Sequence, residues 1–195
     1  MPQQRPTNKR LDEAEKKMRE PSFRHNKGLG NEVGYYVFDY PAKDELIVRE
    51  RIRYWQKRNN LAAEGFSLAV FDLYEIMISL LEQEGFLEQC FEFEKRSGID
   101  EVTNAVMDLL QLDQPDGYLV EFIISHAPAN SIVLLTGVGK CYPVIRSHNV
   151  LNNLHQVFDQ VPVILFYPGS YDGQELVLFD SVKDRNYYRA FRLIP

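Results

Sequence analysis

The sequence has few cysteines, no long apolar run and none of several short motifs that mark common catalytic sites. With only Cys90 and Cys141 it cannot build a disulfide framework, and we expect a cytoplasmic protein with free thiols. No apolar run reaches the roughly 18 residues that a membrane-spanning helix needs. The start MPQQRPTNKR is followed by no apolar segment, which predicts no secretory signal. G-x-S-x-G, H-E-x-x-H and paired C-x-x-C motifs do not occur, so the sites that they mark are not expected.

Charge is distributed unevenly along the 195 residues. Residues 1–30 carry eight basic and four acidic side chains, whereas 31–195 carry 14 basic and 24 acidic ones. The acidic body should repel phosphate backbones, so nucleic acid could make at most a weak contact through 1–30. We interpret 1–30 as a flexible basic extension with a short helix over 11–20 that has only a thin packing face. The apolar positions of that helix are Leu11, Ala14 and Met18.

Apolar residues in 31–195 alternate between the pattern of strands and that of helices. Continuous runs such as YYVFDY (35–40) predict buried strands, and Leu73, Ile76 and Met77 follow the spacing of a helix that faces a core. We expect strands at 35–40, 66–71, 131–136, 161–167 and 175–179, and an edge strand at 189–194. We expect helices at 45–60 after Asp44, 73–84, 86–96, 101–110 after Asp100, 118–124 and 149–158. This order predicts a single three-layer, Rossmann-like α/β domain over 31–195, with a mostly parallel sheet of five to six strands flanked by helices.

The run LLTGVGKCYPVIRSHNVLNNL (134–154) places a glycine-rich turn and Lys140 after a predicted strand. A phosphate-binding loop needs G-x-x-x-x-G-K-[ST], but Leu134 occupies the position of the first glycine and Cys141 that of the hydroxyl residue. Pro143 disfavours helix at the residue before it, so the next helix should begin only near 147–149. The dinucleotide pattern G-x-G-x-x-G lacks its third glycine. The turn therefore does not predict nucleotide hydrolysis.

Polar segments follow the predicted strands at their carboxyl ends, where ligands and partners of open parallel sheets gather. Asp39 and Asp72 end the first two strands, and we expect them to cap or pair structurally. GVGKCYPVIRSH and PGSYDG follow two consecutive strands and should be neighbours. One interpretation is that the glycines simply make tight turns. The other is a ligand or partner cleft, whose candidate residues are Gly137, Gly139, Lys140, Arg146, His148, Gly169, Tyr171 and Asp172.

Two further groups of side chains contain residue types that can bind a metal or act as a nucleophile. Cys141, His148 and His155 recur every seven residues, but the two histidines would lie roughly 10 Å apart along a helix and could not bind one zinc. Cys141 and His148 could form a nucleophile–base pair, but no orienting acid or oxyanion hole is identifiable. We therefore predict a non-catalytic protein with no metal and no cofactor.

The segment DRNYYRAF (184–191) is dense in tyrosine and arginine, which are enriched in binding hot spots. It could equally be the C-terminal strand that closes the core. The candidate residues of a protein interface here are Arg185, Tyr187, Tyr188, Arg189 and Phe191.

Three ordered runs, GVGKCYPVIRSHNVLNNL, VPVILFYPGSYDGQELVLFDSVKD and NYYRAF, resemble the BrxB family of BREX phage-defence systems. The resemblance is strongest over about 131–192. It implies a cytoplasmic, membrane-free role in a system that also contains a DNA methyltransferase, a large ATPase and a phosphatase-like PglZ protein. It carries over no catalytic residues. Together with the acidic body, the incomplete phosphate motif and the aromatic C-terminal segment, it favours a non-catalytic adaptor that docks other BREX proteins, the PglZ-type protein first and the ATPase second. The alternative is a nucleotide-binding relic in which the 137–148 loop holds a nucleotide without hydrolysis.

Overall fold

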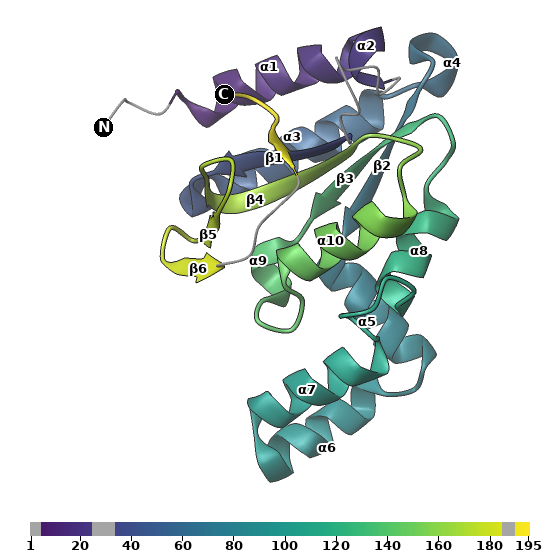
Figure 1. Ribbon diagram of the computed structural model, residues 1–195, viewed down its shortest axis with the longest axis vertical. Helices are drawn as coiled ribbons and strands as arrows, with labels where there is room; N and C mark the ends of the chain where they lie inside the picture. The colour runs from purple at the N-terminus through teal and green to yellow at the C-terminus, as the bar shows by residue number, and fades with distance from the viewer. Residues whose placement is uncertain (1–4, 25–33, 185–189) are drawn as a thin grey trace.

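A mostly parallel sheet with helices on both faces forms the body of the computed structural model, which describes residues 5–24, 34–184 and 190–195 (Figure 1). The parallel strands run in the order β2-β3-β4-β1-β7, and β5 and β6 extend β4 as antiparallel strands. Their bounds are β1 (Tyr35–Tyr40), β2 (Ser67–Asp72), β3 (Ser131–Thr136), β4 (Val163–Tyr171), β5 (Leu176–Leu178), β6 (Val182–Asp184) and β7 (Phe191–Arg192). The predicted Rossmann-like α/β class is confirmed, with seven strands in the described residues where five to six were expected.

The strands read as continuous apolar runs because both faces of the sheet are covered. In β3, Val133 and Leu135 pack into one core cluster while Ile132 and Leu134 pack into the other, and all four are fully buried. This alternation follows from the two-residue period of a strand. Helices α5 (Leu73–Gln83), α8 (Tyr118–His126) and α10 (Ser147–Val157) cover the first cluster, and α1 (Thr7–Arg19), α2 (Pro21–Arg24) and α3 (Glu45–Arg58) cover the second.

Helix α1 packs against the body through a well-buried face. Leu11 and Ala14 are fully buried and Met18 is 2% exposed, because they lie on one side of the helix against the second core cluster. The predicted thin packing face is therefore wrong, and residues 7–24 do not form the flexible extension expected over 1–30. Several basic side chains of this segment are engaged by the protein itself, among them Arg10 with Asp39 and Lys17 Nζ, which donates to Leu193 O at 2.9 Å.

Helices α6 (Leu87–Ser97) and α7 (Ile99–Leu109) form a hairpin that projects away from the sheet (Figure 1). Gly98 joins them at φ +83°, a left-handed backbone that favours glycine. Asp100 was expected to cap α7, but it lies in the first helical turn and Gly98 holds the N-cap position, because the helix begins two residues earlier than predicted. No helix in the described parts of the chain is long and apolar enough to cross a membrane.

The short elements complete the connections between strands and helices. They are η1 (Ala42–Asp44), α4 (Leu61–Glu64) and α9 (Val138–Cys141). Asp44 holds the N-cap position of α3, but its carboxylate accepts no bond from that helix. It accepts instead from the Thr7 hydroxyl at 2.6 Å, which ties α1 to the start of α3. The expected cap is thus replaced by a contact between two helices.

Candidate functional site

The glycine-rich turn after β3 is shaped by close contacts within the protein. Gly137 has φ +79°, and a Cβ at this position would lie 2.3 Å from Asp72 Oδ1. One helical turn, α9, follows directly, where the sequence predicted no helix before 147. Pro143 restricts only the residue before it, so α9 fits between Gly137 and Tyr142, whose backbone is extended. The next helix, α10, begins at Ser147, as predicted.

Lys140 is exposed at the surface, but two carboxylates of the protein hold its amine. Its Nζ lies 2.7 Å from Asp72 Oδ2 and 3.2 Å from Glu75 Oε1, and it stands 5.2 Å from the centroid of the Tyr74 ring. Partial burial lowers the pKa of Lys140, but hydrogen bonds to the two carboxylates outweigh it, so the pKa is raised overall. The amine therefore stays charged while its charge is balanced, which disfavours its use as a phosphate anchor.

Asp72 and Asp39 both have the structural roles that the sequence predicted. Asp72 Oδ1 accepts from the backbone N–H groups of Tyr74 and Glu75 and so caps α5. Asp39 is 3% exposed, and its Oδ1 accepts from Arg10 Nη2 at 2.6 Å. A second guanidinium nitrogen of Arg10, Nη1, donates to the backbone carbonyl Asp39 O at 2.6 Å. A carboxylate and a guanidinium that are both buried must neutralise each other, and here the pair fixes α1 to the end of β1.

A groove of about 400 Å³, which we call the α3 groove, lies between α3 and the carboxyl ends of the central strands. Its apolar lining comes from Val48, Ile52, Val70 and Phe166, and its charged lining from Glu45, Arg49, Arg53, Asp72, Glu75 and Lys140. Burial raises the pKa of Tyr40, whose protonated hydroxyl donates to Glu45 Oε2 at 2.6 Å. Arg49 lies 3.0 Å from the other oxygen of the same carboxylate. Opposite charges thus meet along this wall of the groove.

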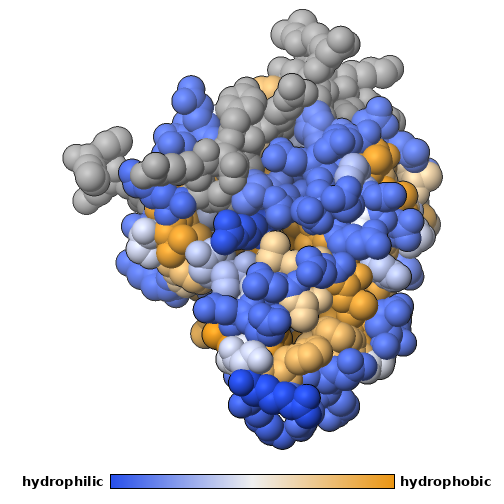
Figure 2. All heavy atoms as spheres, turned by 60° about the horizontal axis from the view of Figure 1, so that its bottom comes forward, coloured by the Kyte–Doolittle hydropathy of each residue, from blue (hydrophilic) through white to orange (hydrophobic). Residues whose placement is uncertain are grey.

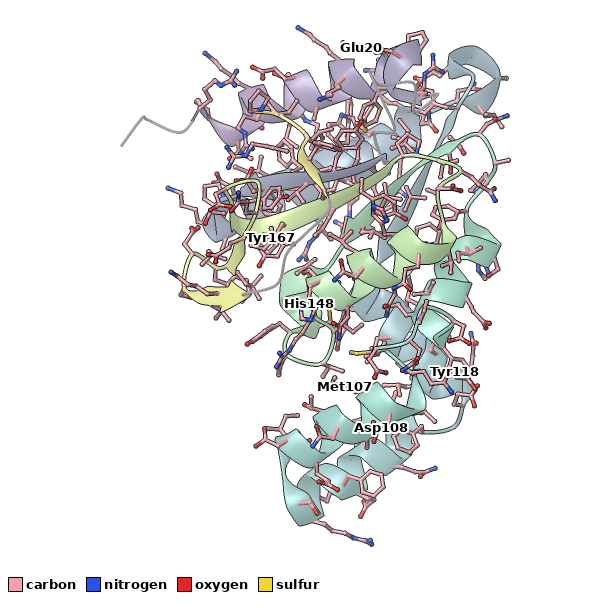
Figure 3. The ribbon with its side chains drawn as sticks, viewed as in Figure 1. Glu20, Met107, Asp108, Tyr118, His148 and Tyr167 are labelled. Atoms are coloured by element: carbon pink, nitrogen blue, oxygen red, sulfur yellow. The ribbon has the colours of Figure 1, made fainter. Side chains whose placement is uncertain are left out.

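The residues predicted to line one cleft lie in separate places. Gly137 and Lys140 line the α3 groove, whereas Arg146 and His148 line a second groove of about 440 Å³ against α7. His148 and Met107 lie on opposite sides of this second groove (Figure 3). The structure therefore places Lys140 and His148 on different surfaces, and Arg146 also lines a smaller pocket of about 70 Å³ beside Tyr167.

The residues expected from PGSYDG do not join either groove. Tyr171 is fully buried, and its hydroxyl donates to Ala190 O at 2.6 Å. Asp172 is exposed, and its pKa is lowered by the backbone N–H groups of Glu175 and Gln174 that donate to it. A Cβ at Gly169 would lie 2.1 Å from Val177 O, so this glycine permits β4 and β5 to approach. Likewise, Gly139 leaves room for the Phe179 ring, 2.9 Å from where its Cβ would be.

Cys141 has the environment of a structural thiol. Desolvation by burial raises its pKa to about 12, so the nucleophilic thiolate is scarce near neutral pH. Its Sγ donates to the carbonyls of Gly137 and Val138, both at 3.4 Å. These contacts favour a packing role over a nucleophile–base pair with His148. Within the described ranges, no three His, Cys, Asp or Glu side chains gather as a metal site.

The candidate C-terminal interface is described only at its end. Arg185, Tyr187, Tyr188 and Arg189 lie outside the described residues. Phe191 lies in β7, at one edge of the parallel sheet, and is 47% exposed. Its ring centroid lies 6.3 Å from that of Tyr36. An exposed aromatic residue at a sheet edge suits a protein contact, so this surface stays a candidate.

A third, widely open groove of about 460 Å³, which no sequence pattern predicted, lies between α5 and α8. It is mainly apolar, and we call it the α5–α8 groove. Its lining residues are Leu80, Tyr118, Glu121, Phe122, Ile124 and Ser125. The helix over 118–124 was predicted, but its contact with α5 brings together residues about 40 positions apart, and periodicity alone cannot pair them.

Comparison with known proteins extends the similarity to nearly the whole chain. A family model described as BREX protein BrxB matches residues 69–193. A BREX protein BrxB of Bacillus cereus (strain H3081.97) is 49% identical over 187 residues, which cover 96% of this chain and 97% of that protein. Another, of Escherichia coli O9:H4 (strain HS), is 31% identical over 186 residues, which cover 95% and 90%. No solved structure matches.

Proposed function

Because this chain belongs to the BrxB family, we propose that it is a component of a BREX phage-defence system and acts as a non-catalytic adaptor within it. In this role it docks other BREX proteins, with a PglZ-type protein as its first partner and the BREX ATPase as its second. Its contribution is to hold these proteins together rather than to transform a substrate.

The observation that carries this proposal is the mutual neutralisation of polar groups at the carboxyl edge of the sheet. This edge is where an α/β enzyme would place its catalytic side chains. Here Lys140 is paired with Asp72 and Glu75, Arg10 with Asp39, and Cys141 has a raised pKa. Groups that satisfy one another make a poor reaction centre, which supports a role in holding proteins together over a role in catalysis.

Co-expression with the cognate PglZ-type protein, followed by size-exclusion chromatography, tests the adaptor function. We expect a shared peak at one-to-one or another fixed ratio, and no loss of the complex when Lys140 is replaced by alanine, because Lys140 is engaged internally. The same experiment with the BREX ATPase ranks the two partners. Separate peaks for every cognate BREX protein would reject the adaptor function.

The second candidate, nucleotide binding without hydrolysis, is favoured by the α3 groove, because Gly137 and Lys140 line it. This function would require ATP at millimolar concentration to raise the melting temperature, and Lys140→Ala to abolish the rise. We expect no shift for either protein, since Asp72 and Glu75 balance the lysine charge and would repel a phosphate. Differential scanning fluorimetry of the two proteins, with and without ATP, decides between the candidates.

A further inference from the structure

The acidic charge of this chain is concentrated in and around the α6–α7 hairpin. Residues 82–116 carry ten acidic and two basic side chains, a net charge of −8, whereas the whole chain has a net charge of −6. The rest of the chain therefore has a balance of +2. A concentration of one sign of charge on a projecting element creates a local field that selects partners of the opposite sign.

The α5–α8 groove lies at the base of this hairpin. Tyr118 begins α8 where the helix meets the end of α7, and its backbone N–H donates to Leu110 O at 3.2 Å (Figure 3). Leu80 lines the groove from the last turns of α5, just before the chain enters the hairpin. The view that brings the hairpin end forward shows apolar side chains exposed among hydrophilic ones (Figure 2). The apolar groove and the acidic hairpin are thus parts of one end of the molecule.

Carboxylates border the apolar lining of the groove. Glu121 belongs to the lining itself and is exposed. Glu84 follows Leu80 by one helical turn, with its N–H donating to Leu80 O at 3.0 Å, so its exposed side chain lies on the same side of α5. Tyr118 is 37% exposed and offers the ring and hydroxyl that are typical of a binding hot spot. An apolar centre with an acidic border matches an apolar stripe flanked by lysine and arginine.

We propose that the α5–α8 groove docks a basic amphipathic helix of another BREX protein. This proposal rests on the adaptor function and names the surface and the partner chemistry for it. A helix suits the site because an apolar groove between two helices accepts side chains spaced at i, i+3 and i+4 from a third. Nucleic acid is disfavoured because its phosphates would meet the acidic hairpin. A second copy is disfavoured because two copies of the acidic segment 82–116, each with a net charge of −8, would approach each other.

Two variants of the full-length protein probe the apolar and the acidic parts of the groove separately. Tyr118→Ala removes the exposed ring, and the double variant Glu84→Gln/Glu121→Gln removes two charges while keeping the side-chain shape. Matched controls lie on the opposite face of the sheet, in α3: Tyr54→Ala, where the tyrosine is 47% exposed, and Glu50→Gln. Phe191→Ala tests the C-terminal surface in parallel. Circular dichroism and melting curves establish that each variant is folded.

Binding to the cognate PglZ-type protein and to the BREX ATPase is measured by biolayer interferometry, at about 0.1 M and about 1 M salt. We expect Tyr118→Ala to weaken the complex by about tenfold or more at both salt concentrations. The double glutamate variant should weaken it at low salt only, because the Debye length shrinks from about 10 Å to about 3 Å and screens the charges. Hydrogen–deuterium exchange of the complex should protect α5 and α8, together with a segment of the partner rich in lysine and arginine.

Each contrary outcome has a distinct meaning. If both groove variants bind the partner with wild-type affinity, the groove proposal is overturned and the adaptor function stands. If only Phe191→Ala then weakens binding, the interface lies at β7. Self-association that disappears in Tyr118→Ala makes a second copy the occupant and overturns the basic helix. If the wild-type protein binds no cognate BREX protein, the adaptor function fails and this proposal fails with it.

Discussion

Replacing Arg10 with alanine is expected to lower the free energy of unfolding by about 3 kcal/mol, near the lower end of the range for breaking a buried ion pair. The substitution leaves the carboxylate of Asp39 buried without its main partner. Two remaining contacts of the carboxylate limit the decrease in the free energy of unfolding. The backbone N–H of Tyr171 donates to Asp39 Oδ2 at 3.2 Å, and Arg192 lies 3.7 Å from the same oxygen. Urea denaturation followed by circular dichroism measures the change.

Arg51→Ala is the matched control for this prediction. Arg51 also joins α1 to the body, through Asp12, but the Asp12 side chain is 59% exposed. Exposed ion pairs contribute within about 1 kcal/mol, so the control should change stability little. Equal losses for the two arginines would mean that burial of the Arg10–Asp39 pair adds nothing. A loss below about 1 kcal/mol for Arg10→Ala would support the flexible extension that the sequence suggested.

The sequence could predict those elements whose residues are continuously apolar. The strand over 131–136 was predicted at its observed bounds because Ile132 to Leu135 are continuously apolar, and every one of them is fully buried. The role of α1 could not be predicted in this way. Its Arg10 looks like one of many solvated basic residues, and its partner Asp39 lies 29 positions away. Only the packing of α1 against β1 makes the arginine a buried residue.

The single cleft failed as a prediction because it assumed that a loop begins where the apolar run of the fourth strand ends. Instead, β4 continues through Pro168 and Gly169 to Tyr171, and the chain then turns back into β5. Tyr171 is therefore part of a strand and points into the core. Lys140, in the turn after β3, pairs with Glu75 of α5 and with Asp72, which caps that helix. It therefore lies away from the groove that Arg146 and His148 line. The third and fourth strands are neighbours, as predicted, but contacts between side chains decided where each group lies.

Within the GVGK turn, Gly137→Ala is expected to lower the free energy of unfolding by about 2–3 kcal/mol. A left-handed backbone at φ +79° costs an L-residue roughly 1–2 kcal/mol. The new Cβ would also lie 2.3 Å from Asp72 Oδ1, so the carboxylate must move. Moving it weakens the cap of α5, which is worth about 1 kcal/mol, and the ion pair with Lys140. Chemical denaturation measures the loss, and a shift in the urea midpoint without a change in slope identifies it as a change in stability.

Gly139→Ala separates this structural role from a ligand-binding role of the same turn. Its Cβ would meet the end of the Phe179 ring at 2.9 Å, but that side chain is 42% exposed and can move aside. The expected loss is therefore about 1 kcal/mol or less, clearly smaller than for Gly137→Ala. A turn that cradled phosphate would depend on both glycines for binding, and ATP would stabilise the wild type but neither variant. Unequal losses of stability that ATP does not alter would mean that Gly137 is required for the close approach of the β3–α9 turn to the cap of α5.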